Sequence, residues 1–203
     1  MKKRVLAMLF AAMMVCGVAG CGGAEKDAET ENTAQEEVAE PTKEEEMMGY
    51  LAALPEEIPV ETAVKAGFFT IKDGAVAGGQ EAWDAFIAAS GNGEEASVIL
   101  CQYTEMDGAV LDFLYYSTET GYLLVTDETR GGFEDTEEET RGEYYTRSFE
   151  VLKVFDDFSL KEGGTVYDIC VLTNEAELDA ATFATYWTEM SMDAHQTMLL
   201  YVI

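Results

Sequence analysis

Ala96-Ser97-Val98-Ile99-Leu100-Cys101-Gln102-Tyr103 is a strand-like apolar segment in this 203-residue chain. Its four central residues, Val98 to Cys101, are apolar at both alternating positions, which is typical of a strand covered on both faces. We therefore expect residues 96–103 to form a central strand.

Two more strands are predicted directly after it, at residues 109–116 and 122–126, joined through residues 117–121. Short strands in quick succession favour an antiparallel meander. Asp112 and Thr126 place a polar side chain in each of them, so we expect these two strands to have one wetter face.

The residues before the central strand predict a short strand and a helix. Residues 68–71 form a brief apolar run that ends at Asp73-Gly74, a pair suited to a tight turn. Trp83, Phe86 and Ile87 then recur at helical spacing, so one apolar helical face is expected to pack on the sheet.

The C-terminal part predicts two longer strands, a helix and a last strand. The strands are expected at residues 145–155 and 165–172, and the last one at residues 198–203. Asn174 and Glu177 have the spacing of a capping box, which predicts a helix that begins there. Together these elements predict an α+β fold: a mainly antiparallel sheet with about two packed helices.

Residues 21–48 predict an acidic, disordered tether. Residues 22–48 hold ten acidic residues against two lysines, with scarcely any large apolar residue before Met47. Such a composition cannot bury a core. We therefore expect a single domain over residues 49–203.

Residues 1–20 have the pattern of a signal peptide. Lys2-Lys3-Arg4 precede an uncharged run, Val5 to Val18, that is too short for a transmembrane helix. Val18-Ala19-Gly20-Cys21 resembles the bacterial lipobox, which implies cleavage before Cys21 and lipidation of its thiol. The protein is then expected on the outer face of the cell membrane. An ordinary signal peptide that happens to contain a cysteine is the alternative.

The charge is strongly negative. Removal of residues 1–20 takes three of the 12 basic residues and none of the 40 acidic ones, so the formal charge changes from −28 to −31. Such a field repels nucleic acids and anionic lipid headgroups. Cationic partners or metal ions fit better, and solubility alone is the simpler explanation.

Only Cys101 and Cys170 remain for the folded part. Two cysteines in an exported protein allow a Cys101–Cys170 disulfide. Both lie in apolar runs, where a free cysteine packs as a small hydrophobic residue, and this is the alternative.

Several blocks of sequence carry a family resemblance. They are Ala66-Gly67-Phe68-Phe69, Trp83-Asp84-Ala85-Phe86, Val98 to Glu105, Tyr115-Tyr116 and Thr129-Arg130-Gly131-Gly132-Phe133. They resemble an uncharacterised family of envelope lipoproteins of Gram-positive bacteria. Glu105-Met106-Asp107-Gly108 lacks the family's turn proline, and Gly131 stands where an acid is expected. The resemblance implies the same location and no particular chemistry.

Arg130 is the leading candidate for ligand binding. Its planar donors suit a carboxylate or a phosphate, and it follows a predicted strand in a chain with few basic residues. Asp127, Tyr103 and Thr104 lie at the ends of neighbouring strands and are expected to share its rim. A structural ion pair with Asp127 or a loop acid is the alternative.

A second candidate is a calcium site in the acidic loop after Arg130. Hard cations bind several oxygen ligands, and the loop offers five carboxylates at a spacing that matches no EF-hand. They belong to Glu134, Asp135, Glu137, Glu138 and Glu139. A solvated loop is the alternative.

The sequence lacks the usual catalytic motifs. His195 is the only histidine, and neither a Gly-x-Ser-x-Gly elbow nor a His-Glu-x-x-His pair occurs. We therefore expect no cofactor and a non-catalytic, lipid-anchored extracytoplasmic domain that binds an unidentified protein or small ligand. The alternatives are an envelope enzyme, thiol-dependent through His195 or calcium-assisted, and a passive structural lipoprotein.

Overall fold

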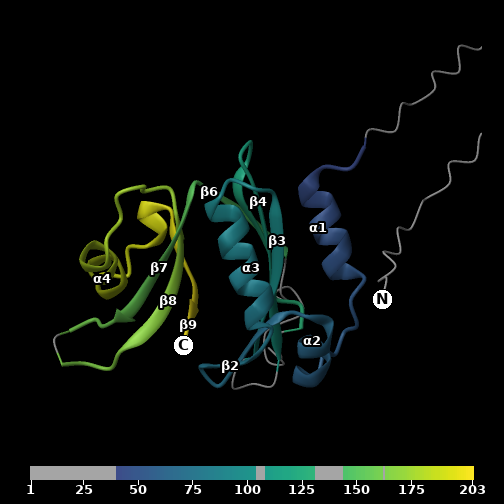
Figure 1. The fold of residues 1–203 in the computed structure, drawn as a ribbon, viewed down its shortest axis with the longest axis horizontal. Coiled ribbons are helices and arrows are strands. Elements are labelled where there is room, and N and C mark those ends of the chain that lie inside the picture. Colours follow the sequence, from purple (N-terminus) through teal and green to yellow (C-terminus); the bar gives the residue numbers. More distant parts are fainter. Residues whose placement is uncertain (1–39, 104–107, 131–143, 162) are drawn as a thin grey trace, which may run out of the picture. The chain divides into compact units, whose positions relative to one another are not determined.

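The computed structural model describes residues 40–103, 108–130, 144–161 and 163–203, and these form an α+β fold (Figure 1). The predicted fold class and the mainly antiparallel pairing are confirmed. Four α-helices occur among the described residues, two more than predicted. The helices are α1 Lys43–Ala52, α2 Val60–Ala66, α3 Gln80–Gly91 and α4 Ala180–Thr188, with a short 3₁₀ helix η2 Asp193–His195. The strands are β1 Phe69–Lys72, β2 Ala75–Gly78, β3 Ala96–Tyr103, β4 Ala109–Ser117, β5 Gly121–Asp127, β6 Tyr144–Phe149, β7 Val151–Phe158, β8 Tyr167–Thr173 and β9 Thr197–Val202.

Six strands form one sheet in the order β2-β1-β3-β4-β5-β6. Strands β1 and β3 run parallel, and the other neighbouring pairs described in this sheet are antiparallel. The predicted meander is β3-β4-β5. Leu100 and Cys101 point to opposite faces of β3 and are both 0% exposed, which confirms that this strand is covered on both sides.

The expectation of a wetter face at Asp112 and Thr126 is wrong. Their exposed fractions are only 2% and 6%. The Thr126 hydroxyl donates to Asp112 Oδ1 at 2.6 Å, and Gln102 Nε2 donates to Asp112 Oδ2 at 3.1 Å. Because the polar groups satisfy one another across neighbouring strands, they are accommodated inside the core.

The strand predicted at residues 145–155 is in fact two strands. Strand β6 ends at Phe149 and pairs with β5, whereas β7 begins at Val151 and pairs with β8. Between them, the Glu150 N–H donates to Asn174 Oδ1 at 2.9 Å. The chain therefore leaves the first sheet at Glu150 and enters a second sheet, in the order β7-β8-β9. The predicted last strand is confirmed as β9, paired with β8.

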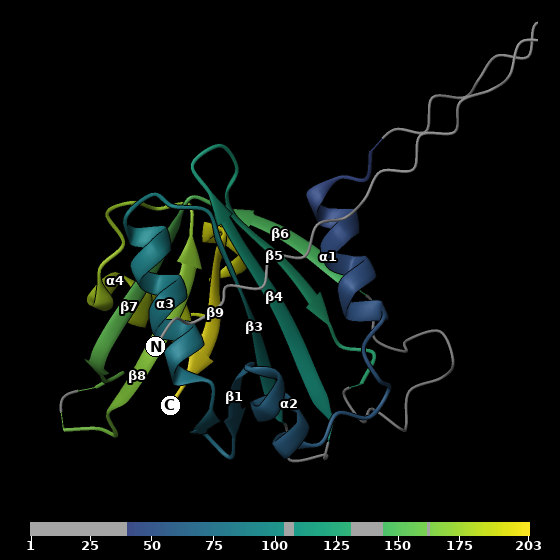
Figure 2. The same cartoon turned by 45° about the vertical axis from the view of Figure 1, so that its right-hand side comes forward.

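Figure 2 shows the arrangement of these helices and strands from a second direction. Three clusters of apolar side chains pack them together. The first lies between the two sheets and includes Trp83 and Phe86 of α3. The second packs α1 and α2 against the other face of the six-stranded sheet, and the third packs α4 against the outer face of the three-stranded sheet. Each sheet is thus covered on both faces.

Helix α4 begins later than predicted. Asp179 is its N-cap and accepts the Thr182 N–H at 2.7 Å. Asn174 does not cap a helix, because its side chain bonds Glu150 and donates to Gln196 Oε1 at 2.7 Å. Helix α3 confirms the predicted helical face, and Asp73 and Gly74 have positive φ as the predicted turn requires.

Helix α1, with Thr42 as its N-cap, lies ahead of the predicted domain boundary at residue 49 and inside the segment predicted as a tether. Thr42 and Glu45 form a reciprocal capping box. Met47 and Leu51, four residues apart, are both buried against the sheet. These two buried side chains give α1 an apolar face that packs on the sheet, although the composition of this segment predicts a tether. No helix among the described residues is long and apolar enough to cross a membrane.

Candidate functional site

Arg130 is bound internally rather than presented to a ligand. Its guanidinium pairs with the buried carboxylate of Asp127. It also donates to the carbonyls of Leu51 at 3.0 Å, Leu54 at 3.1 Å and Pro55 at 2.9 Å, at the end of α1 and just after it. A cation at a helix C-terminus binds orphan carbonyls and favours the helix dipole. The structure thus forms the ion pair with Asp127 that the structural alternative predicted, and a ligand-binding role for Arg130 and Asp127 stays a prediction.

Tyr103 is the other described member of that predicted rim. Its hydroxyl donates to the Ile58 carbonyl at 2.6 Å. Tyr103 and Arg130 do line a common surface cavity of about 350 Å³, beside Glu56 and Glu57. The structure thus brings these two side chains to one cavity, but their hydrogen-bond donors are bonded to backbone carbonyl groups. Thr104 lies outside the described residues.

The predicted calcium loop cannot be placed. Its five acids, Glu134, Asp135, Glu137, Glu138 and Glu139, lie outside the described residues, as does Cys21. Within residues 40–103, 108–130, 144–161 and 163–203, no three acidic, histidine or cysteine side chains gather as metal ligands. The calcium site stays a prediction.

The two cysteines are free and buried, so the Cys101–Cys170 disulfide that the sequence allows is not formed. Cys101 belongs to the cluster under α1 and α2, whereas Cys170 belongs to the cluster between the sheets. The six-stranded sheet therefore separates them. Burial raises the pKa of both thiols, which opposes the thiolate form that a nucleophile needs.

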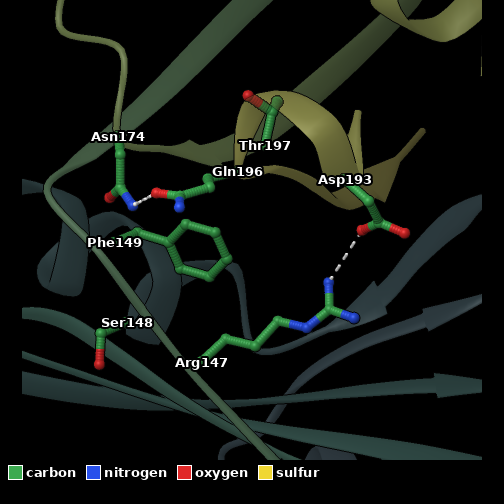
Figure 3. Close-up of a pocket in the computed structure, with 7 residues that line it drawn as sticks. All are labelled: Arg147, Ser148, Phe149, Asn174, Asp193, Gln196 and Thr197. Carbon is green, nitrogen blue, oxygen red and sulfur yellow. Dashed lines mark hydrogen bonds and ion pairs between the residues drawn. The ribbon is translucent and has the colours of Figure 1, made fainter. Parts of the chain in front are cut away.

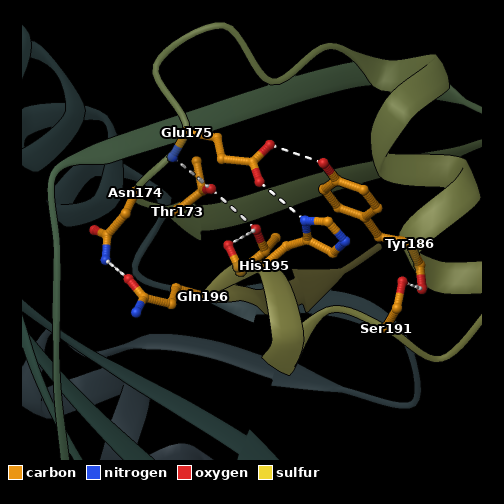
Figure 4. A network of polar contacts seen from close by, with 8 residues as sticks. Thr173, Asn174, Glu175, Tyr186, Ser191, His195 and Gln196 are labelled. Carbon is orange, nitrogen blue, oxygen red and sulfur yellow. Dashed lines mark hydrogen bonds and ion pairs between the residues drawn. The ribbon is translucent and has the colours of Figure 1, made fainter.

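His195 lies in a cluster with Glu175 and Tyr186 (Figure 4). Its Nδ1 is 3.1 Å from Glu175 Oε1, and the Tyr186 hydroxyl donates to Glu175 Oε2 at 2.9 Å. The imidazole stacks on the Tyr186 ring with a centroid distance of 3.8 Å and an interplanar angle of 9°. This cluster ties η2 to α4 and to the end of β8.

The cluster brings no nucleophile to the imidazole. The nearby Ser191 hydroxyl donates to the Tyr186 carbonyl at 3.5 Å, and neither buried cysteine is among the described contacts of His195. The Cys–His pair considered from the sequence is therefore not formed. These contacts hold η2, α4 and the end of β8 together, which is a structural role.

A cleft opens between the two sheets, where β6 and β9 lie at the ends of their respective strand orders. One part of it, of about 330 Å³, is lined by Arg147, Ser148, Phe149, Asn174, Asp193, Gln196 and Thr197 (Figure 3). Arg147 Nη1 lies 3.4 Å from Asp193 Oδ1, and both side chains are well exposed. The Phe149 ring lies between two polar pairs, Arg147 with Asp193 and Asn174 with Gln196 (Figure 3).

The second part of the cleft is larger and more apolar. It measures about 560 Å³ and shares Arg147, Asp193 and Thr197 with the first. Its other lining residues are Trp187, Met190, Met192, Met198 and Leu199. Met190 is 91% exposed, so this surface is not covered by the described part of the chain. We call the two parts together the β6–β9 cleft.

Sequence reasoning missed this cleft for an identifiable reason. The strand predicted at residues 145–155 runs without a break from Arg147 into β7, and the sequence predicts no end for the helix after Asn174. The cleft exists because the chain turns at Glu150 and because α4 ends before Met190. The available signal was the concentration of methionines at positions 190, 192 and 198.

Comparison with known proteins assigns no function to these sites: the chain matches no protein-family model, no curated protein and no solved structure. The resemblance of Ala66-Gly67-Phe68-Phe69 and the related blocks to envelope lipoproteins stays a prediction.

Proposed function

We propose that this chain is a lipid-anchored extracytoplasmic protein whose folded part binds another protein, without catalysis, in the β6–β9 cleft. The observation that carries the proposal is the apolar lining formed by Trp187 and three methionines, of which Met190 is 91% exposed and the others are partly buried. Apolar surface in a groove with polar residues at its rim is typical of sites that bind another protein.

The anchoring part of the proposal rests on the sequence. Cys21 follows a signal-like apolar run, and α1, with Thr42 as its N-cap, is the first helix that the structure describes. The acidic composition of residues 22–41 predicts a spacer between the lipid and the domain. An unstructured spacer of that length would reach about 25 Å. The site faces the cell exterior in this arrangement.

The chemistry of the cleft points to an apolar segment that carries lysine or arginine. Methionine side chains are flexible and polarizable, so they adapt to irregular apolar partners. The surrounding residues 144–161 and 163–203 contain nine acidic residues and three lysines or arginines, so their field favours a cationic partner. Arg147 is already paired with Asp193, so its positive charge does little to offset this negative field.

Binding of a defined peptide tests this function. The probe is a fluorescently labelled synthetic peptide of leucine and lysine, and its control has glutamate in place of lysine. Fluorescence anisotropy with the full chain is expected to show binding of the lysine peptide only.

Two matched variants locate the site. Met190→Gln keeps the side-chain length and is expected to weaken binding several-fold, because it places an amide in the apolar lining. Leu160→Gln changes an exposed apolar residue outside the cleft and is expected to have no effect. Equal affinity of wild type and Met190→Gln, or equal binding of the glutamate peptide, would refute the proposal.

A further inference from the structure

A separate cavity of about 570 Å³ lies on the other side of the six-stranded sheet from the β6–β9 cleft, between α1 and strands β3 and β4. The side chains that matter here are Lys43, Glu46 and Tyr50 of α1, Glu95 just before β3, and Phe113 and Tyr115 of β4. We call it the α1–β4 pocket. It is open to solvent and combines aromatic rings with carboxylates.

Three aromatic side chains form one wall of the pocket. Phe113 and Tyr115 are two residues apart in β4 and therefore lie on the same face of the sheet. The Tyr50 ring packs edge-on to Phe113 with centroids 5.6 Å apart, and Tyr50 is 48% exposed. The face of an aromatic ring carries partial negative charge and attracts cations.

The chain's own Lys43 shows which chemistry this wall accepts. Its ammonium lies 5.1 Å from the centroid of the Tyr115 ring and 2.6 Å from Glu46 Oε2. The hydrogen bond to Glu46 and the charge of Glu95 both raise the pKa of Lys43. An ammonium group is thus held by a ring face and a carboxylate together.

The charges of the pocket are not balanced by this lysine. Glu46 and Glu95 contribute two negative charges and Lys43 one positive charge. The Tyr50 and Phe113 rings have no cation over them among the described contacts. The pocket therefore has room, aromatic surface and net negative charge for one more monovalent cation.

We propose that the α1–β4 pocket binds a small organic cation through its ammonium group, with the carbon skeleton against Tyr50 and Phe113 and the charge near Glu95 and Tyr115. The Lys43 ammonium already lies over the Tyr115 ring and beside Glu46, so it competes with the ligand for these groups. A primary amine and a quaternary ammonium compound share this chemistry. The site is distinct from the β6–β9 cleft, so its test is independent of the proposed function.

Calorimetric titration of the full chain with choline chloride tests the proposal, with sodium chloride at equal ionic strength in every sample. Choline is expected to bind saturably, and its neutral carbon isostere, which has the same shape without the charge, is expected not to bind. Ethanolamine provides the primary-amine arm. The tighter of the two cations identifies the class of ligand, and either result supports an ammonium site.

Three variants test the assigned residues. Lys43→Met removes the competing cation and is expected to tighten choline binding by roughly fivefold. Tyr115→Leu is expected to weaken it by about fivefold, whereas the control Tyr115→Phe keeps the ring face and the affinity. Glu95→Gln, an exposed substitution that leaves the fold intact, is expected to weaken binding to a similar degree.

The proposal fails if the neutral isostere binds as well as choline, because the pocket is then merely apolar. It also fails if Lys43→Met leaves the affinity unchanged or lowers it. If Tyr115→Leu does not fold, Glu95→Gln decides, and equal affinity of that variant and the wild type would overturn the assignment.

Discussion

Asp112→Asn is expected to stabilise the protein at neutral pH and to remove part of the pH dependence of its stability. Burial raises the pKa of Asp112 from the ordinary 3.8 to about 6, although the hydrogen bonds from Thr126 and Gln102 oppose this. Above about pH 6, the folded protein therefore holds a buried negative charge.

The sign and size of the effect follow from proton linkage. Between pH 3.8 and about 6 the folded state binds more protons at Asp112 than the unfolded state does, so stability falls as the pH rises. The difference between about 6 and 3.8, at about 1.4 kcal/mol for each pH unit, corresponds to about 3 kcal/mol in all. Roughly half of this free energy of unfolding, about 1.4 kcal/mol, is regained when the pH is lowered from 7.5 to 5.

Asparagine suits the site because the hydrogen bonds survive. Its carbonyl oxygen accepts from Gln102 Nε2, and its amide donates to the Thr126 hydroxyl, which is able to accept as well as donate. Asp112→Asn is therefore expected to gain as much as about 3 kcal/mol at pH 7.5, with the gain shrinking toward pH 5.

Urea unfolding of wild type and variant at pH 5, 6 and 7.5 measures this difference. The control is Asp73→Asn, an exposed turn position where asparagine also tolerates positive φ. Titration of the many other carboxylates affects all three proteins alike. A constant difference between wild type and Asp112→Asn across the pH range would refute a buried charge at Asp112.

Three further predictions concern the packing around the sites. Arg130→Met should destabilise the protein by about 3–5 kcal/mol in urea unfolding, because it leaves the carboxylate of Asp127 buried without its cation; a loss below about 1 kcal/mol would contradict that role. Thr42→Ala should cost about 1 kcal/mol by loss of the helix cap, and should increase amide hydrogen exchange in α1 but not in α3. Cys101 and Cys170 should react with a thiol reagent only on unfolding, and a reductant should leave the melting temperature unchanged; a drop would indicate a disulfide.

Prediction from sequence worked best where the hydrophobic pattern is local. The apolar alternation of Val98 to Cys101 identified the central strand, and Trp83 and Phe86 identified the helix that packs on it. Their burial follows from side-chain periodicity alone. The polar pair Asp112 and Thr126 was misplaced, because periodicity does not show that two polar groups will satisfy each other.

The candidate sites were less predictable than the fold. Arg130 has the chemistry of a ligand-binding residue, and only the position of the end of α1 shows that its donors are used internally. Trp187 lies in α4, Met190 and Met192 follow the end of that helix, and all three line the β6–β9 cleft, which the helical pattern alone does not predict.

The α+β class, the middle strand buried on both faces and the meander after it are all predictable from the amino-acid sequence. These features depend on side-chain period and turn residues within a few positions of each other. Three other features are visible only in the folded chain: the change of sheets at Glu150, the separation of Cys101 from Cys170 by a sheet, and the cleft between β6 and β9. Such relations depend on which distant surfaces pack together, and no local pattern encodes that choice.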